Sequence, residues 1–209
     1  MTVEHFIWDF DGTLFDTYPH TCAAFTEILR RRGVTPDPAV LYAKMKLSVL
    51  EALRWAQADP AFTEEFYALE NTLTFEPVGR PFPGIPALLR AIAERGGKNY
   101  LYTHRDRVAY EYFKLYGLSS LFSGGVTAED GFPHKPAPDA LNHLVSVYGM
   151  DRGRTMMLGD RLIDIEAGKN AGLLTCLFDP DRTLPEDAAD RFCADVPALR
   201  ALAEELLPS

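Results

Sequence analysis

The sequence predicts an α/β protein with a doubly wound parallel sheet and an all-helical segment inserted after the first strand. Short apolar runs alternate with longer helical patterns along most of the chain. The runs are apolar throughout, as expected for strands buried on both faces. Between Thr17 and about Arg80 only helical patterns occur. Strands that alternate with helices form a parallel sheet covered on both sides, so this stretch is an insertion.

Four apolar runs are the strongest strand candidates, and a fifth, near Gly124–Val126, is weaker. The four are His5–Asp9, Asn99–Thr103, Thr155–Leu158 and Leu174–Phe178. The helices expected between and after them are Ile85–Arg95, Asp106–Tyr116, Pro138–Tyr148, Ile163–Ala171 and Pro197–Leu207. Glycine follows four of these helical runs, which is a common helix stop. Asp106 and Asp195 are expected to cap the helices that follow them.

The insertion is expected to contain four helices. They are Pro19–Arg32, Pro38–Lys46, Ser48–Ala58 and Pro60–Thr74. Ser48 and Glu51 fit a capping box at the start of the third. The exit, EPVGRPFPG, is rich in proline and glycine, which marks a connection. The predicted domains are therefore an α/β core, residues 1–16 and 81–209, and a helical domain, residues 17–80.

Composition narrows the classes of partner. Acidic residues outnumber basic ones by 30 to 21, which gives a net charge of −9. Nucleic acids and anionic membranes reward clustered positive charge, so neither is expected as a partner. No run approaches the ~20 apolar residues of a spanning helix, and no basic segment followed by an apolar one begins the chain. We expect a cytoplasmic protein, whose cysteines at 22, 176 and 193 are small buried apolar residues.

Polar side chains gather where the predicted strands end. The first strand ends at Asp9, with Asp11 two residues on. The run at 155–158 is followed by Gly159 and Asp160, with Asp164 four residues further on. Lys135 comes just before a predicted helix. Because ligands bind at the carboxyl ends of parallel strands, we expect these groups on one rim. Residues two apart on an extended chain point the same way, so the first two acids can face one cavity.

So many carboxylates in one crevice repel each other unless a cation is bound. An oxygen-only set of ligands suits Mg²⁺, which commonly also takes substrate phosphate and water. Gly12 lets the backbone approach a ligand, and free N–H groups there could hold phosphate oxygens. Thr103 ends the second strand and His104 follows it, on the same expected rim.

Four segments resemble, in order, the motifs of the haloacid dehalogenase-like hydrolase superfamily. They are DFDGTLFDT, the threonine of LYTHRD, the lysine of HKPAPD and the acids of GDRLIDIEAG. The resemblance covers nearly the whole chain, and the helical insertion resembles the small helical cap of the phosphoglycolate phosphatase-like branch. It implies a Rossmann-like core. Because the insertion has two joins, near Asp16–Tyr18 and Pro77–Pro83, we also expect a cap that opens to admit substrate and closes to exclude water.

The resemblance implies a role for each motif residue. Asp9 would be the nucleophile, and Asp11 the acid and then the base. Mg²⁺ would be held by the Asp9 carboxylate, the Asp11 backbone carbonyl and Asp160. Asp164 would support the metal site through water or the motif lysine.

Further roles concern the phosphoryl group. Thr103 would hydrogen-bond its oxygens, and Lys135 would neutralise both the nucleophile and the transferring group. His104 and Arg105 are variable positions in the family and could touch substrate. Arg161 departs from the pattern, because the family often has a small residue such as serine there, and a cation could contact Asp164 or the cap. His20, Lys44, Lys46 and Arg54 lie in the predicted cap and could meet anionic groups of a substrate, although solvated helix faces explain them equally well.

The expected function is a Mg²⁺-dependent phosphatase of a small phosphorylated metabolite, phosphoglycolate-like or a sugar phosphate, with an aspartyl-phosphate on Asp9. The protein would act as a monomer or homodimer. A phosphosugar mutase would retain all four motifs, and a phospho-aspartate signalling switch shares strand-end acids, threonine and lysine. A dehalogenase does not need a second acid at Asp11, and nothing marks Lys44 or Lys46 as the Schiff-base lysine of a phosphonatase. A degenerate binding module ranks last, because all expected catalytic residues are present.

Overall fold

The computed structural model describes residues 2–208. The chain folds into two compact units. One unit comprises Met1–Phe15 and Pro81–Ser209, and the other comprises Asp16–Arg80. Two short strands, β2 (Phe15–Asp16) and β3 (Arg80–Pro81), pair where the chain passes from one unit to the other. The sequence did not predict this pair, because two residues are too few to show a strand pattern.

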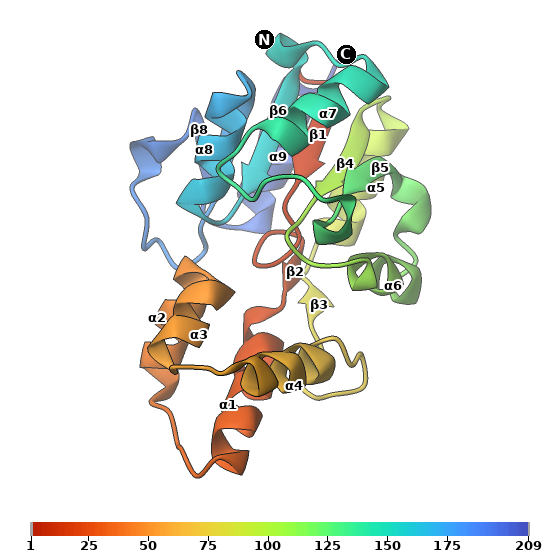
Figure 1. The fold of residues 1–209 in the computed structure, drawn as a ribbon. Coiled ribbons are helices and arrows are strands. Elements are labelled where there is room, and N and C mark those ends of the chain that lie inside the picture. The colour runs from red at the N-terminus through yellow and green to blue at the C-terminus, as the bar shows by residue number, and fades with distance from the viewer. Residues whose placement is uncertain (1, 209) are drawn as a thin grey trace. The chain divides into compact units, whose positions relative to one another are not determined.

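A six-stranded sheet forms the centre of the first unit (Figure 1), in the order β5-β4-β1-β6-β7-β8. The strands are β1 (His5–Trp8), β4 (Lys98–Tyr102), β5 (Phe122–Val126), β6 (Thr155–Gly159), β7 (Leu174–Phe178) and β8 (Arg191–Cys193). All neighbouring strands are parallel. The predicted parallel α/β fold is therefore confirmed, and the five predicted strand positions each hold a strand. The sixth, β8, is a short edge strand that the sequence did not predict.

Helices cover both faces of this sheet. They are α5 (Ile85–Glu94), α6 (Val108–Leu115), α7 (Asp139–Tyr148), α8 (Leu162–Asn170) and α9 (Val196–Leu206). On one face Ile7, Tyr100 and Met157 occupy aligned register positions and pack in one apolar cluster with residues of α7 and α8. On the other face α5 packs against β4 and α9. The sheet is thus doubly wound, as predicted.

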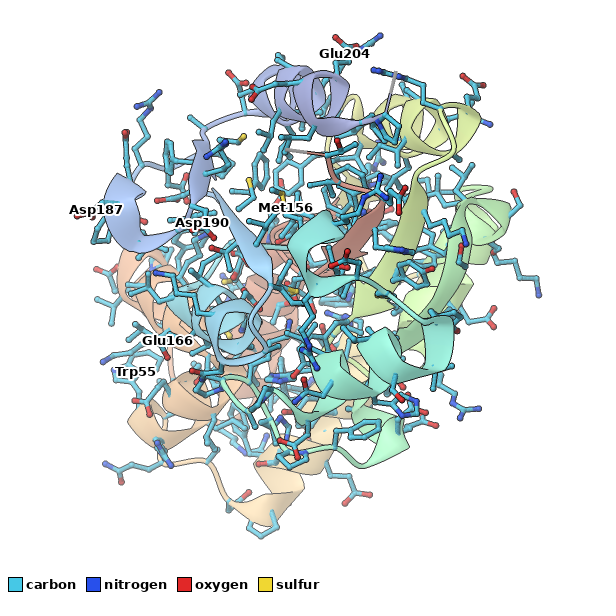
Figure 2. All side chains as sticks on the ribbon, turned by 90° about the horizontal axis from the view of Figure 1, so that it is seen from above. Trp55, Met156, Glu166, Asp187, Asp190 and Glu204 are labelled. Carbon is cyan, nitrogen blue, oxygen red and sulfur yellow. The ribbon has the colours of Figure 1, made fainter. Side chains whose placement is uncertain are left out.

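Local capping agrees with most predicted helix starts. Asp195 accepts the N–H of Ala198 at 2.8 Å and caps α9. Asp106 accepts the N–H of Val108 at 2.9 Å, but α6 begins only at Val108. Figure 2 shows the resulting division between interior and surface, with Met156 of β6 inside the unit and Glu204 at its periphery.

The second unit consists of four helices: α1 (Tyr18–Arg31), α2 (Pro38–Leu47), α3 (Val49–Trp55) and α4 (Pro60–Glu70). Their apolar faces meet in one core that includes Phe25, Phe62 and Phe66. Ser48 caps α3, because its hydroxyl accepts the N–H of Glu51 at 3.0 Å. The sequence predicted that the fourth helix ends at Thr74, but α4 ends at Glu70. Across residues 2–208, no helix has the length and apolar character needed to cross a membrane.

A buried asparagine forms hydrogen bonds that join the sheet to the helices beside it. Asn99 on β4 is fully buried, and its Oδ1 accepts the indole N–H of Trp8 at 3.0 Å. Its amide nitrogen donates to the carbonyl oxygens of Leu89 and Leu121 at 3.1 and 3.2 Å. The side chain therefore satisfies one buried donor and two carbonyls from three different elements, as buried polar groups require.

Replacing Asn99 by alanine should lower the free energy of unfolding by about 3 kcal/mol, because it leaves these buried groups unpaired. Urea denaturation monitored by circular dichroism measures the change. Asn142→Ala on α7, where the side chain is partly exposed, is the matched control and should stay within about 0.5 kcal/mol of the parent. A loss no larger than that of the control would contradict this account of Asn99.

Candidate active site

Three of the predicted site residues are each the first residue after a central strand. Asp9 follows β1, Thr103 follows β4, and Asp160 follows β6. The register aligns Trp8 with both Leu101 and Leu158. Parallel strands end at one edge, so the sheet brings these three residues to the same edge.

Three buried carboxylates meet at this edge. One oxygen from each of Asp9, Asp160 and Asp164 lies within 4.8 Å of the other two, and all three residues are at most 1% exposed. Gly159 makes the approach possible, because a Cβ there would lie only 2.2 Å from the Cβ of Asp164. Sequence reasoning had given this glycine no role of its own, although its place before Asp160 was a usable signal.

The cluster fits a hard divalent cation such as Mg²⁺. All of its donors are carboxylate oxygens, the ligands that Mg²⁺ prefers. The Oδ2 atom of Asp9 is buried and has no hydrogen-bond partner among residues 2–208. A buried carboxylate oxygen without a donor is costly unless a cation satisfies it. The side chain of Asp11 is not part of this cluster.

Lys135 supplies the positive charge nearest to the cluster. Its side chain is fully buried, and Nζ lies 2.5 Å from Asp9 Oδ1 and 2.7 Å from Asp164 Oδ1. Nζ also donates to the carbonyl oxygen of Tyr102 at 3.0 Å. Asp9 and Asp164 thus contact the same ammonium group, although they lie 126 and 29 positions from Lys135 along the chain. The predicted lysine and three of the four predicted acids are brought together.

The charges in this cluster shift one another's pKa values. Burial raises the pKa of Asp9 to about 7, against the opposing charge of Lys135. For Asp164 burial acts in the same direction, but the charges of Lys135 and Arg161 outweigh it and lower its pKa. Burial alone would lower the pKa of Lys135, yet Asp164 and Asp9 raise it. The lysine is therefore held as an ammonium ion.

Arg161 brings a second cation to the same carboxylates. Its guanidinium nitrogens lie 4.0 Å from Asp9 Oδ1, 3.8 Å from Asp160 Oδ1 and 3.7 Å from Asp164 Oδ2. These separations are longer than direct hydrogen bonds. The backbone N–H of Arg161 donates to Asp164 Oδ2 at 3.0 Å. The residue that departs from the motif thus adds charge at the rim of the cluster.

Asp11 has a different partner from Asp9. Its carboxylate is about a quarter exposed and pairs with Arg105, whose side chain is only 6% exposed. Nη2 donates to Oδ1 at 2.8 Å, and Nε lies 3.2 and 3.3 Å from Oδ1 and Oδ2. Sequence reasoning had placed Arg105 as a residue that could touch substrate. The structure instead places its guanidinium on Asp11.

Thr103 and Gly12 form hydrogen bonds with the backbone of the loops that follow β4 and β1. Thr103 is buried, and its Oγ1 accepts the N–H of Arg105 at 3.0 Å, which leaves the hydroxyl proton to be donated elsewhere. Gly12 has a φ of 77°, which glycine adopts readily. Its N–H donates to the carbonyl of Phe15 at 2.7 Å. A tight turn therefore uses the N–H of Gly12 itself, and the role of this loop in binding phosphate stays a prediction.

His104 orients the lysine. Its Nε2 accepts the backbone N–H of Lys135 at 2.9 Å, so this nitrogen carries no proton. Burial, together with the charges of Lys135 and Arg161, lowers the pKa of His104 to about 3. The ring is therefore neutral, and the Nε2 atom that could have met a substrate is already engaged.

In the helical unit, the predicted substrate-facing residues have mixed surroundings. His20 is fully buried, with Nε2 2.6 Å from the carbonyl of Glu70 and Nδ1 2.9 Å from that of Pro77. The sequence had left open whether His20 meets a substrate or lies on a solvated helix face; its buried ring joins α1 to the end of α4 and to the exit segment. Lys46 lies over the ring of Tyr18 at 4.8 Å, and Arg54 pairs with an exposed glutamate on its own helix.

Residues 6–178 match the family model described as haloacid dehalogenase-like hydrolase. A phosphoglycolate phosphatase of Neisseria gonorrhoeae is 31% identical over 189 residues, which cover 83% of the chain and 78% of that protein. The chain belongs to the haloacid dehalogenase-like hydrolase family. An N-acetylmuramic acid 6-phosphate phosphatase of Pseudomonas aeruginosa is 28% identical and covers 94% of the chain and 90% of that protein.

The fold is shared more widely than the sequence. The crystal structure of a predicted phosphoglycolate phosphatase from Haemophilus somnus superposes with a TM-score of 0.83 at 16% identity, over 97% of this chain and 98% of that one. At this identity the likeness supports the fold alone. The family match and the relatives confirm the predicted enzyme class, a hydrolase of the phosphatase type in the haloacid dehalogenase-like family.

The buried neutral His104 predicts a pH-dependent contribution to the stability of this hydrolase. The unfolded chain binds a proton at this histidine below about pH 6.5, whereas the folded chain does so only near pH 3. The unfolded state therefore holds more protons in this window, and stability is lost as the pH falls from 6.5. The loss due to this one residue is at most about 1.4 kcal/mol per pH unit.

His104→Gln keeps an acceptor for the Lys135 N–H but has no group that titrates. Urea denaturation at a series of pH values between 7 and 4.5 should show a shallower fall in unfolding free energy for the variant than for the parent. Any constant cost of the substitution cancels, because only the slopes are compared. Parallel curves across this range would rule out the buried neutral histidine as a source of acid lability.

Proposed function

We propose that the chain is a Mg²⁺-dependent phosphatase that hydrolyses small phosphorylated metabolites through a phosphorylated Asp9. The observation that carries the proposal is the buried cluster of Asp9, Asp160 and Asp164, in which the ammonium group of Lys135 contacts Asp9 and Asp164. The named activities of the relatives, phosphoglycolate phosphatase and N-acetylmuramic acid 6-phosphate phosphatase, support the substrate class.

Asp9 is the nucleophile in this proposal. Lys135 holds one carboxylate oxygen at 2.5 Å and fixes the orientation of the group toward the strand edge. An Asp9 oxygen attacks phosphorus, the bond from phosphorus to the ester oxygen breaks, and an acyl phosphate forms. The side chains of Asp9, Asp160 and Asp164 would hold the metal, together with the backbone carbonyl of Asp11. When bound, Mg²⁺ would neutralise charge on the phosphoryl group and on the carboxylates.

Asp11 moves the protons. It lies outside the carboxylate cluster and is partly exposed, so it can reach both a leaving group and water. It gives a proton to the leaving oxygen in the first step and takes one from the attacking water in the second. Thr103 is placed to donate its hydroxyl proton to a phosphoryl oxygen, and Lys135 neutralises the transferring group.

We further propose that the helical unit acts as the cap of this enzyme. It is inserted between β1 and α5, directly after the loop that carries Asp9 and Asp11. Within the core unit, the N–H of Phe82 donates to the carbonyl of Leu14, so the exit of the insertion is tied to that loop. Opening and closing of a cap would admit substrate and exclude water.

The proposal predicts that the protein releases phosphate from some members of a panel of phosphorylated metabolites, and that Asp9→Asn lowers kcat by at least about 1,000-fold. A coupled phosphate assay measures this. Asp187→Asn is the matched control, because Asp187 lies exposed at the periphery (Figure 2) and should leave kcat unchanged. Activity that survives Asp9→Asn would refute the mechanism. Isomerised phosphosugar in place of free phosphate would assign the chain to the mutases.

The metal is tested separately from activity. Mg²⁺ at 100 times its dissociation constant should raise the free energy of unfolding by about 2.7 kcal/mol, because it binds the folded state only. Asp160→Asn should remove this increment without lowering metal-free stability, since it also removes one of three repelling carboxylates. Asp187→Asn should retain the increment. Equal stabilisation of parent and Asp160→Asn by Mg²⁺ would place the metal elsewhere.

A further inference from the structure

A buried arginine holds the side chain that moves protons in the proposed mechanism. The guanidinium of Arg105 makes three contacts of 2.8 to 3.3 Å with the two oxygens of Asp11. The side chain of Arg105 is 6% exposed. Arginine is seldom buried unless it is paired, and burying it costs free energy that the pair only partly returns. A role in stability alone therefore explains this pair poorly.

The loop after β4 fixes the arginine from several sides. The backbone N–H of Arg105 donates to Thr103 Oγ1 at 3.0 Å, and the backbone carbonyl of Arg105 accepts the N–H of Ala128 at 3.0 Å. The guanidinium carbon lies 5.7 and 6.0 Å from the ring centres of Phe10 and Tyr112. A planar guanidinium held in this way presents its donors in one direction, which a flexible ammonium group would not do.

The contacts distinguish the two oxygens of Asp11. Of the contacts with Arg105, the two shorter ones, at 2.8 and 3.2 Å, go to Oδ1, and the one at 3.3 Å goes to Oδ2. The fork of Arg105 sets the plane of the Asp11 carboxyl group, and with it the direction in which Asp11 can give or take a proton. Correct placement of a general acid within hydrogen-bond reach is worth a large part of its effect on rate.

We infer that Arg105 is a positioning residue that aims the Asp11 carboxyl at the oxygen of the leaving group. The inference rests on the proposed phosphatase function. In the first step an Asp9 oxygen bonds to phosphorus, and the phosphorus–ester oxygen bond breaks with its electron pair on the ester oxygen. The proton of Asp11 moves to that oxygen, and an alcohol leaves. In the second step water bonds to phosphorus, its proton passes to Asp11, and the bond to Asp9 breaks.

The test compares two esters of similar shape, benzyl phosphate and p-nitrophenyl phosphate. The benzyloxy oxygen must gain a proton as it leaves as benzyl alcohol, whereas p-nitrophenolate leaves without a proton. The ratio kcat/KM reports only the steps up to release of the leaving group. Arg105→Met keeps the apolar stem of the side chain and removes the fork. It should lower kcat/KM by about 100-fold for benzyl phosphate and by less than about 3-fold for p-nitrophenyl phosphate.

The second step adds an independent readout. Asp11 acts there as a base for every substrate, so the kcat of Arg105→Met on p-nitrophenyl phosphate should fall together with its KM, while acyl phosphate on Asp9 accumulates. Asp11→Asn should reproduce both patterns. Arg105→Lys keeps the charge but not the fork and should recover little of the lost activity. Arg107→Met, at an exposed arginine two residues on, is the matched control and should leave both esters unaffected.

Equal losses of kcat/KM for the two esters in Arg105→Met would overturn the inference, since they would point to a structural or phosphate-binding role. Unchanged activity on both would overturn it as well. If circular dichroism shows that Arg105→Met does not fold, Arg105→Lys takes its place. The loss of kcat/KM should then again be much larger for benzyl phosphate than for p-nitrophenyl phosphate. A parent protein that hydrolyses neither these esters nor the metabolite panel would instead overturn the proposed function, and with it this inference.

Discussion

The arrangement of the core unit depends on three carboxylates that are held together where water does not reach them. Asp9, Asp160 and Asp164 repel one another at this separation, and each would be costly to bury alone. Lys135 offsets part of that cost, because its ammonium group contacts two of the three. The requirement explains local features around it. Gly159 has no side chain to displace Asp164, and His104 anchors the backbone of the lysine.

The cations of the site are divided between two tasks. Lys135 and Arg161 lie beside the buried cluster, whereas Arg105 pairs with Asp11. Asp9 and Asp11 are two residues apart, yet one is 1% exposed and the side chain of the other is about a quarter exposed. A nucleophile benefits from a desolvated, fixed position, whereas a proton carrier must reach solvent and a leaving group. In the proposed mechanism, separate counter-charges let these neighbouring acids take different roles.

The strands and the gathering of acids could be predicted, because the signals are local. Apolar runs mark β1, β4, β6 and β7, and the parallel order follows from their alternation with helices. The partner of Arg105 could not be predicted, since it lies 94 residues away and an arginine in a polar loop usually remains solvated. The use of the Gly12 N–H depended on the exact turn at Phe15. Strand β8 was missed because three residues, one of them an arginine, show no pattern.

The chemistry and the choice of substrate are carried by different kinds of residue. In the proposed mechanism, Asp9, Thr103, Asp160 and Lys135 act on the phosphoryl group, which is the same in every phosphomonoester. Relatives of comparable similarity are named for phosphoglycolate and for N-acetylmuramic acid 6-phosphate, which differ only beyond that group. Selection between such esters therefore has to come from side chains other than those at the strand ends. A single set of strand-end residues can serve many substrates, provided that the acid which protonates the leaving group is held in place independently of what that group is.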